Sequence, residues 1–197
     1  HRSGPSFSIE FFPPKTPKGE AALYRTVDDL RRYAPSYVSV TWGAGGATRG
    51  KTVEWAERIK KEHGVESMAH LTCVGATRAE LEEILRELDD HGIENILALR
   101  GDPPKGETAF RPVAGGFAHA TELVAFIRDR FGARFSIGVA GYPETHPEAP
   151  DAETDLRHLV DKVAAGADFV VTQLFFDNAA FLRFRERFRA MAGPVHA

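Results

Sequence analysis

The sequence predicts an α/β fold of repeated βα units, and three observations predict it. Apolar segments end at polar residues followed by Gly or Pro, they alternate with amphipathic helical stretches, and they recur about every thirty residues, the length of one strand with its returning helix. Mostly apolar strands of this kind form parallel sheets. We therefore predict the first six units of a (βα)8 TIM barrel. The six segments are Phe7–Phe12, Tyr37–Trp42, Ser67–Cys73, Asn95–Arg100, Phe135–Tyr142 and Phe169–Phe175.

The intervening segments show helical periodicity. Thr77 and Glu80 form a capping-box pattern, and Gly92 stands where the C-cap belongs. We expect every apolar stripe to pack its helix onto the barrel. The stripes, in chain order, are Leu23, Val27 and Leu30; Val53, Ala56 and Ile59; Leu81, Ile84, Leu85 and Leu88; Leu123, Phe126 and Ile127; Leu156, Leu159, Val160 and Val163 before Gly166; and Phe181, Phe184 and Phe188, with Asn178 as the expected N-cap.

Composition narrows the class of protein. The 197 residues are 43% hydrophobic with a net charge of −3 and no basic patch, so we expect no nucleic-acid partner. Cys73 is the only cysteine, which rules out an intrachain disulfide and favours a reducing, cytoplasmic setting. No apolar run approaches the roughly 18 residues of a membrane span, so no membrane association is expected. A (βα)8 barrel needs about 250 residues, so we expect residues 1–197 to be a single, C-terminally incomplete barrel domain.

The carboxyl ends of the strands form the active face of a βα barrel, and polar residues gather there. They are Glu10, Thr41, His70, Arg100 with Asp102, Tyr142 and Gln173. The apolar neighbours of Glu10 would raise its pKa and suit it to general acid catalysis, although an exposed or ion-paired Glu remains the simpler reading. Asp102 can place a second charge beside a ligand, or merely start a turn before Pro103. The irregular stretch Pro103–Gly116 is expected to form a lid or mobile loop over this face.

Other kinds of site are less well supported. Gly43–Thr48 has the composition to approach a phosphate or a flat ring, but it lacks the full dinucleotide fingerprint. His70 and Cys73 should project to opposite faces of one strand, so we expect no metal. No strand carries a lysine for a Schiff base, and no serine stands in a nucleophile elbow. The tripeptide Arg100-Gly101-Asp102 directly follows a buried strand, which argues against a cell-adhesion role.

Six motifs in order resemble the successive signatures of the methylenetetrahydrofolate reductase family. They cover essentially the whole chain: Ser8–Lys15 (SIEFFPPK), Val40–Gly46 (VTWGAGG), His70–Cys73 (HLTC), Leu99–Pro104 (LRGDPP), Tyr142–Glu148 (YPETHPE) and Thr172–Asp177 (TQLFFD). The resemblance implies a flavoprotein barrel that takes hydride from NADH or NADPH onto FAD. The hydride then passes to 5,10-methylenetetrahydrofolate and gives 5-methyltetrahydrofolate. Similar bacterial enzymes form homo-oligomers, so a homo-oligomer is possible here.

The resemblance also assigns roles to residues. It implies that Glu10 protonates a folate nitrogen, that Asp102 lies beside flavin and folate, and that Gln173 orients the pterin or the nicotinamide. This chain departs from the resemblance at His158, where similar bacterial enzymes carry Arg, which implies one fixed charge fewer to hold FAD. The positions that match FAD contacts are Thr41, His70, Arg100, Gly101, Asp102, Ala118, Tyr142, His146, Asp155 and Lys162.

Two other hypotheses remain open. One is a different barrel enzyme, such as a lyase for a phosphorylated metabolite, with Glu10 as base and Gly43–Gly46 on the phosphate. The other is a non-catalytic, truncated barrel that binds flavin poorly. Both would be colourless, so an absorption spectrum near the flavin bands separates them from the reductase, and a melting curve separates them from each other.

Overall fold

A computed structural model describes residues 6–42, 49–103, 106–107 and 109–193. Within them, six parallel strands form one sheet in the order β1-β2-β3-β4-β5-β6. The strands are β1 Ser8–Phe11, β2 Tyr37–Val40, β3 Ser67–Thr72, β4 Asn95–Leu99, β5 Ser136–Gly141 and β6 Phe169–Thr172. The helices are α1 Pro17–Arg31, α2 Arg49–His63, α3 Arg78–Asp90, α4 Ala120–Phe131, α5 Ala152–Ala164 and α6 Asn178–Ala192. The predicted alternation of strand and helix is confirmed.

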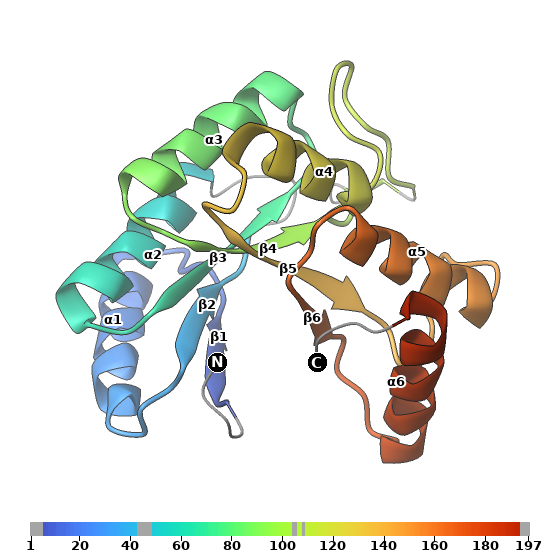
Figure 1. The fold of residues 1–197 in the computed structure, drawn as a ribbon. Coiled ribbons are helices and arrows are strands. Elements are labelled where there is room, and N and C mark those ends of the chain that lie inside the picture. The colour runs from blue at the N-terminus through green and yellow to red at the C-terminus, as the bar shows by residue number, and fades with distance from the viewer. Residues whose placement is uncertain (1–5, 43–48, 104–105, 108, 194–197) are drawn as a thin grey trace.

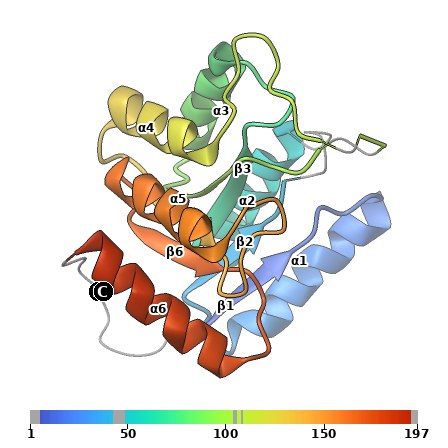
Figure 2. The same cartoon turned by 90° about the vertical axis from the view of Figure 1, so that its right-hand side faces the viewer.

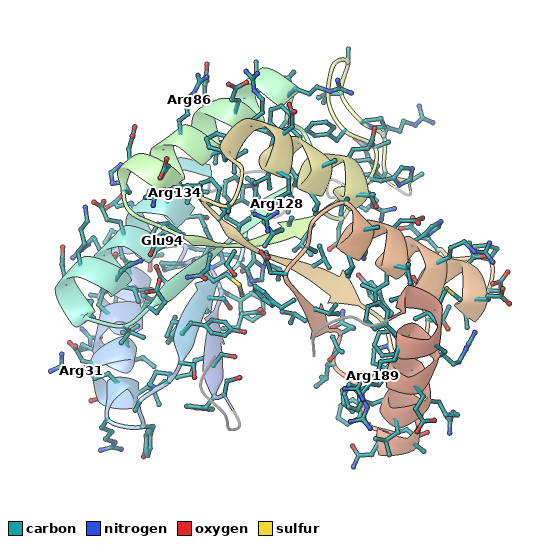
Figure 3. The ribbon with its side chains drawn as sticks, in the orientation of Figure 1. Arg31, Arg86, Glu94, Arg128, Arg134 and Arg189 are labelled. Carbon is teal, nitrogen blue, oxygen red and sulfur yellow. The ribbon has the colours of Figure 1, made fainter. Side chains whose placement is uncertain are left out.

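The sheet is curled, with the helices on its outer, convex side (Figures 1 and 2). This is the architecture of a partial barrel, and the two outer strands of the sheet, β1 and β6, each have one strand partner among the described residues. Charged side chains such as Arg31 on α1 and Arg86 on α3 project away from the sheet (Figure 3). Their side chains are 58% and 62% exposed.

The largest cluster of buried apolar side chains fills the space between the sheet and its helices. The outward-facing residues Ala69, Leu71, Ile96, Ala98, Ile137 and Val139 belong to this cluster, together with the α3 stripe Leu81, Ile84, Leu85 and Leu88. A second cluster joins α1 and α2 to β2 through residues including Leu23, Val27, Val38, Val40 and Ile59. Residues from the predicted stripes of α1 to α5 are therefore buried in these clusters. On α6 no residue is buried, and Phe184 and Phe188 pack only partly against the first cluster.

Strand register decides which side chains face the inside of the curl. Glu10 pairs with Ser39, and Ser39 with Met68, so these three lie on one face. His70 lies two residues beyond Met68 and therefore points to the same side. Because alternate residues share a face, the polar residues Glu10, His70 and Thr72 point inward together with Met68, while Ile9, Phe11, Ala69 and Leu71 point toward the helices.

Local signals set the helix ends, with one correction. The Thr77 Oγ1 accepts from Glu80 N at 3.3 Å, and Glu80 Oε2 accepts from Thr77 N at 2.7 Å, so the predicted capping box is confirmed. The expectation of Asn178 as an N-cap is wrong. The preceding Asp177 caps α6 by accepting from Ala179 N at 2.8 Å, and its carboxylate removes the need for a cap one residue later.

The loop from Pro103 to Gly116, predicted to be a lid or mobile loop, contacts α3 at its C-terminal end. Gly116 forms a bridge with Thr77, and the Gly115 carbonyl accepts from Arg78 N at 3.0 Å. These contacts fasten the end of the loop to the start of α3. Residues 104, 105 and 108 of this loop lie outside the described residues, as does the whole Gly43–Thr48 segment, for which we predicted a phosphate or ring contact.

Within the described ranges, no helix combines the length and the apolar character needed to cross a membrane. No group of three or more His, Cys, Asp and Glu side chains there is arranged to hold a metal ion.

Candidate active site

Glu10 and His70 meet on the inner face of the sheet. The Glu10 Oε2 lies 3.5 Å from His70 Nε2, although the glutamate side chain is 49% exposed and the histidine side chain only 7%. Burial lowers the pKa of His70 to about 4, so its imidazole is neutral near pH 7. Partial burial also raises the pKa of Glu10, as predicted. His70 is therefore a neutral imidazole, and the neighbouring Glu10 carboxyl group keeps its proton to a higher pH than an exposed glutamate does.

Three buried side-chain atoms on β3 lack a hydrogen bond within the described residues: Ser67 Oγ, His70 Nε2 and Thr72 Oγ1. His70 and Thr72 lie two positions apart and so share the inner face, whereas Ser67 alternates to the outer one. Buried polar groups in proteins normally have a partner, so unsatisfied ones indicate a place where a ligand or water binds. Thr72 was not predicted as a site residue. Its position two residues after His70 was the signal that could have found it.

Gly101 shapes the end of β4. Its φ of +87° lies in the left-handed region, and a Cβ built there would stand 2.8 Å from Val74 Cγ1 and 3.0 Å from Thr72 Cβ. Only glycine combines that conformation with so close an approach. The neighbouring Asp102 is exposed at the rim.

Arg100 is held by three groups. Its Nη1 and Nη2 donate to the two carboxylate oxygens of Glu148 at 2.7 and 2.9 Å, and its Nε donates to the Gly101 carbonyl at 3.3 Å. The guanidinium lies over the ring of Phe110, 5.0 Å from its centroid. The Glu148 carboxylate is the main cause of the raised pKa of Arg100. Glu148 and Phe110 were not singled out from the sequence.

The end of β5, the loop that follows it and α5 bring four predicted cofactor residues together: Tyr142, His146, Asp155 and Lys162. The rings of Tyr142 and His146 meet edge to face at 4.6 Å, and Asp155 Oδ2 accepts from His146 N at 2.9 Å. Lys162 donates from Nζ to the Ala140 carbonyl at 2.5 Å, and burial lowers its pKa to about 8 against the opposing attraction of Asp155. The arrangement combines an aromatic ring, a carboxylate and a buried amine.

The remaining predicted positions are more scattered. Thr41 is half-buried just beyond β2, Ala118 donates its N–H to Glu122 Oε2 at 2.7 Å, and His158 is exposed on α5. Gln173 is exposed just beyond β6, and its Oε1 accepts from Leu174 N at 2.8 Å. Gln173 follows β6 and Glu10 lies on β1, and these strands form opposite edges of the sheet. The two strands are not paired in this structure, so pairing does not bring Gln173 next to Glu10.

Cys73 faces away from this site. Its side chain belongs to the cluster between sheet and helices, and its Sγ donates to the Leu99 carbonyl at 3.4 Å. Burial raises the pKa of the thiol to about 12. The expected separation of His70 and Cys73 onto opposite faces is confirmed.

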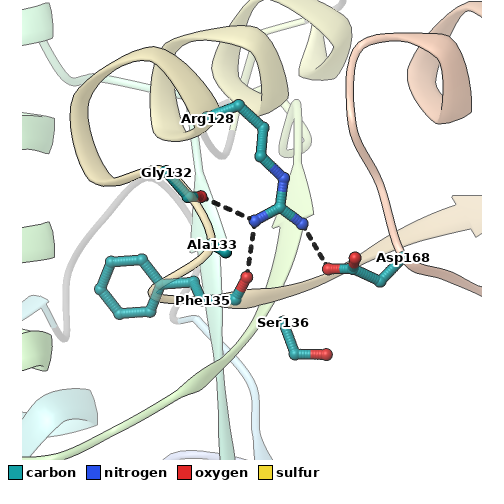
Figure 4. Close-up of a pocket in the computed structure, with 6 residues that line it drawn as sticks. All are labelled: Arg128, Gly132, Ala133, Phe135, Ser136 and Asp168. Atoms are coloured by element: carbon teal, nitrogen blue, oxygen red, sulfur yellow. Dashed lines mark hydrogen bonds and ion pairs between the residues drawn. The ribbon is translucent and has the colours of Figure 1, made fainter.

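Two pockets lie at opposite ends of the sheet. One of about 400 Å³ is at the amino ends of β5 and β6, where the Arg128 guanidinium binds the Gly132 and Phe135 carbonyls and the Asp168 carboxylate (Figure 4). Its charged groups satisfy one another, so we assign it a structural role. The other, of about 110 Å³, is at the carboxyl end of β5, and Tyr142 and Asp155 line it. The smaller pocket is thus the one on the predicted active face.

Solved structures with a similar fold are distant in sequence. A 2,3-dimethylmalate lyase of the PEP mutase/isocitrate lyase superfamily superposes with a TM-score of 0.58 at 10% identity, over 92% of this chain and 62% of that one. An aldolase called QR15 gives 0.58 at 15% identity, over 96% and 76%. At these identities the likeness concerns the fold alone.

Sequence relatives are closer and share one name. Methylenetetrahydrofolate reductase (NADH) 1 of Arabidopsis thaliana is 46% identical over 188 residues, which are 91% of this chain and 32% of the relative. The 5,10-methylenetetrahydrofolate reductases of Salmonella typhimurium and Escherichia coli are each 44% identical over 180 residues, or 91% of this chain and 58% of theirs. The chain thus spans about a third of the plant relative and somewhat over half of the bacterial ones. Residues 2–196 match the sequence model of the family described as methylenetetrahydrofolate reductase, and the chain belongs to that family.

Proposed function

We propose that this chain is the FAD-binding part of an enzyme that reduces 5,10-methylenetetrahydrofolate to 5-methyltetrahydrofolate with electrons from NADH or NADPH. Family membership supports the reaction. The observation that carries the assignment to these residues is the pairing of Glu10, whose pKa is raised, with a neutral His70 on the inner face of the sheet. We further propose that the curled sheet is part of a (βα)8 barrel, since β1 and β6 each have an unpaired side among the described residues.

The residues at the carboxyl ends of the strands fit a flavin nucleotide. Thr72 Oγ1 and His70 Nε2 are buried without a hydrogen bond in the described part of the chain, although Glu10 Oε2 lies 3.5 Å from the histidine nitrogen, and so both can bind a ligand that covers them. Gly101 lets the turn after β4, which carries Arg100 and Asp102, pack closely against Thr72 and Val74. Arg100 and Lys162 are the cations for phosphate oxygens, and Tyr142 and His146 supply aromatic surface. When bound, FAD supplies the hydride chemistry, while the protein supplies orientation and electrostatics.

Glu10 acts in this proposal as the general acid. Its carboxyl group gives a proton to a nitrogen of the folate imidazolidine ring, which opens the methylene bridge to the iminium that accepts hydride. Burial raises the pKa of Glu10, so the acid form persists to higher pH than for an exposed glutamate. The acid form is lost as the pH rises through that raised pKa. Folate reduction should therefore fall on the alkaline side, whereas flavin reduction by NADH should not follow this titration.

Asp102 and Gln173 complete the proposed roles. Asp102 carries a negative charge at the rim, where it would favour a cationic folate over a neutral one. The Gln173 amide has both donor and acceptor groups, which suits it to orient the pterin. In this structure its Oε1 accepts from Leu174 N, so ligand binding would replace that local hydrogen bond.

Two measurements test the proposal. Freshly purified protein should show flavin absorption bands, and colourless protein that does not take up added FAD would exclude the flavoenzyme. In the second, Glu10→Gln is compared with wild type in the two half-reactions by stopped flow. Flavin reduction should be nearly unchanged, and folate reduction should fall by roughly 10²-fold or more, as expected for loss of a general acid. Equal losses in both half-reactions would show that Glu10 has another role.

A further inference from the structure

Arg100 and Glu148 join two loops that are distant in the sequence. The pair is bidentate, with distances of 2.7 and 2.9 Å, and it connects the end of β4 with the loop between β5 and α5 across 48 residues. The arginine side chain is 23% exposed and the glutamate side chain 54%. An ion pair this close to water adds little to stability, so its importance lies in the geometry that it imposes.

The contacts leave part of the guanidinium free to bind a ligand. Arginine has five N–H donors. Glu148 takes two of them and the Gly101 carbonyl takes the Nε donor, so these contacts with the described residues leave two N–H groups of the guanidinium unused. The Phe110 ring covers one face of the guanidinium and limits its rotation. Arg100 is therefore held in one orientation by contacts that leave two of its donors for a ligand.

The main chain of Glu148 also orients His146, a second predicted cofactor residue. The Glu148 N–H donates to His146 Nδ1 at 3.0 Å. A neutral histidine that accepts at Nδ1 carries its proton on Nε2, so the bond selects that tautomer. His146 in turn donates its N–H to Asp155. One residue thus orients both a cation and a ring donor on the same rim of the sheet.

We propose that Glu148 is a positioning residue of the cofactor site, which holds Arg100 ready to bind the diphosphate of a flavin dinucleotide. The inference rests on the proposed function. A long, flexible arginine would otherwise have to be ordered when the ligand binds, and that ordering weakens binding. Glu148 itself need not touch the ligand, because it acts through the guanidinium.

Binding of two flavins to the purified protein tests this role. FAD contains the diphosphate and riboflavin does not, and both are followed by quenching of flavin fluorescence in the full chain. Glu148→Ala should weaken FAD binding by roughly five- to tenfold, the range expected when one side chain must be ordered on binding. Riboflavin binding should stay within twofold of wild type. In an Arg100→Met background, Glu148→Ala should have no further effect on FAD binding.

Controls separate this role from a general loss of structure. Glu144→Ala removes an exposed carboxylate from the same loop and should leave both affinities unchanged. Glu148→Gln keeps the shape of the side chain and should give a smaller loss for FAD in the same direction, even if the alanine variant unfolds. Three outcomes would overturn this inference but leave the proposed function standing. They are equal weakening of FAD and riboflavin binding, unchanged FAD binding in Glu148→Ala, and additive effects of Glu148→Ala and Arg100→Met. A wild-type protein that binds neither flavin would overturn the proposed function and this inference with it.

Discussion

Replacing Gly101 with alanine should destabilise the protein by both backbone strain and a steric clash. The left-handed conformation at φ +87° costs a residue with a Cβ about 1–2 kcal/mol. In addition, the new methyl group would stand 2.8 Å from Val74 Cγ1 and 3.0 Å from Thr72 Cβ, both within a packed part of the fold. Overpacking of this kind typically costs about 1–3 kcal/mol. The expected loss of unfolding free energy is therefore about 2–5 kcal/mol.

Gly92 provides a matched control for the backbone contribution. Its φ is +75°, but a Cβ built there meets no atom within 4 Å among the described residues. Gly92→Ala should therefore cost about 1–2 kcal/mol. The difference between the two variants measures the clash at the end of β4.

Urea unfolding of both variants, analysed by linear extrapolation, supplies the two free energies. The clash also displaces the turn that carries Arg100 and Asp102, so Gly101→Ala should bind FAD more weakly while Gly92→Ala should not. Losses of stability that agree within about 0.5 kcal/mol would refute the steric argument, since surface changes without such a mechanism vary by that much. Normal FAD binding by a destabilised Gly101→Ala would refute the link between this turn and the cofactor site.

Two further predictions concern charge. Asp102→Asn removes one negative charge with little change of shape, so the flavin reduction potential should rise and folate should bind more weakly; an unchanged potential and unchanged folate affinity would leave Asp102 as a turn residue. Burial lowers the pKa of Lys162 from 10.5 to about 8, so the unfolded chain binds more protons between those values and the apoprotein should become more stable as pH rises through that window. Melting temperatures of wild type and Lys162→Met, measured between pH 8 and 10.5, test this prediction. If the melting temperature of Lys162→Met rises with pH as much as that of wild type, groups other than Lys162 cause the rise.

The sequence predicted the strand and helix order well because those signals are local. Apolar runs that end at Gly or Pro, and the Thr77–Glu80 capping box, lie within single elements and need no knowledge of tertiary contacts. Boundaries were less certain. The predicted strand Phe169–Phe175 ends at Thr172 in the structure, because apolar residues continue into the loop where only hydrogen bonding to β5 defines the end. The predicted N-cap of α6 was one residue too late, because Asp177 and Asn178 are adjacent and both have side chains that can cap a helix.

The positions of site residues on strands could be predicted from the alternation of side chains, but the contacts between residues on different loops could not. Glu10 and His70 lie on the inner face because alternate strand residues share a face, so their proximity follows from the predicted sheet. The contact of Arg100 with Glu148 depends on two loops 48 residues apart, and no periodicity reports it. Gln173 lies in a recognisable motif, but the hydrogen bond that its side chain forms within the described residues is to the adjacent Leu174 N and brings it to no other predicted site residue.

The acid strength of Glu10 is tied to the extent of the sheet around it. The glutamate side chain is 49% exposed, and its strand β1 has a strand partner on one side only among the described residues. A further strand beside β1, as in the closed barrel that we propose, would remove more water from the carboxyl group. Desolvation is the cause of the raised pKa, so closure would raise it further and extend the pH range of the acid form. In the proposed reaction, closure of the sheet would then keep Glu10 protonated to higher pH, and it would also cover the edges of β1 and β6.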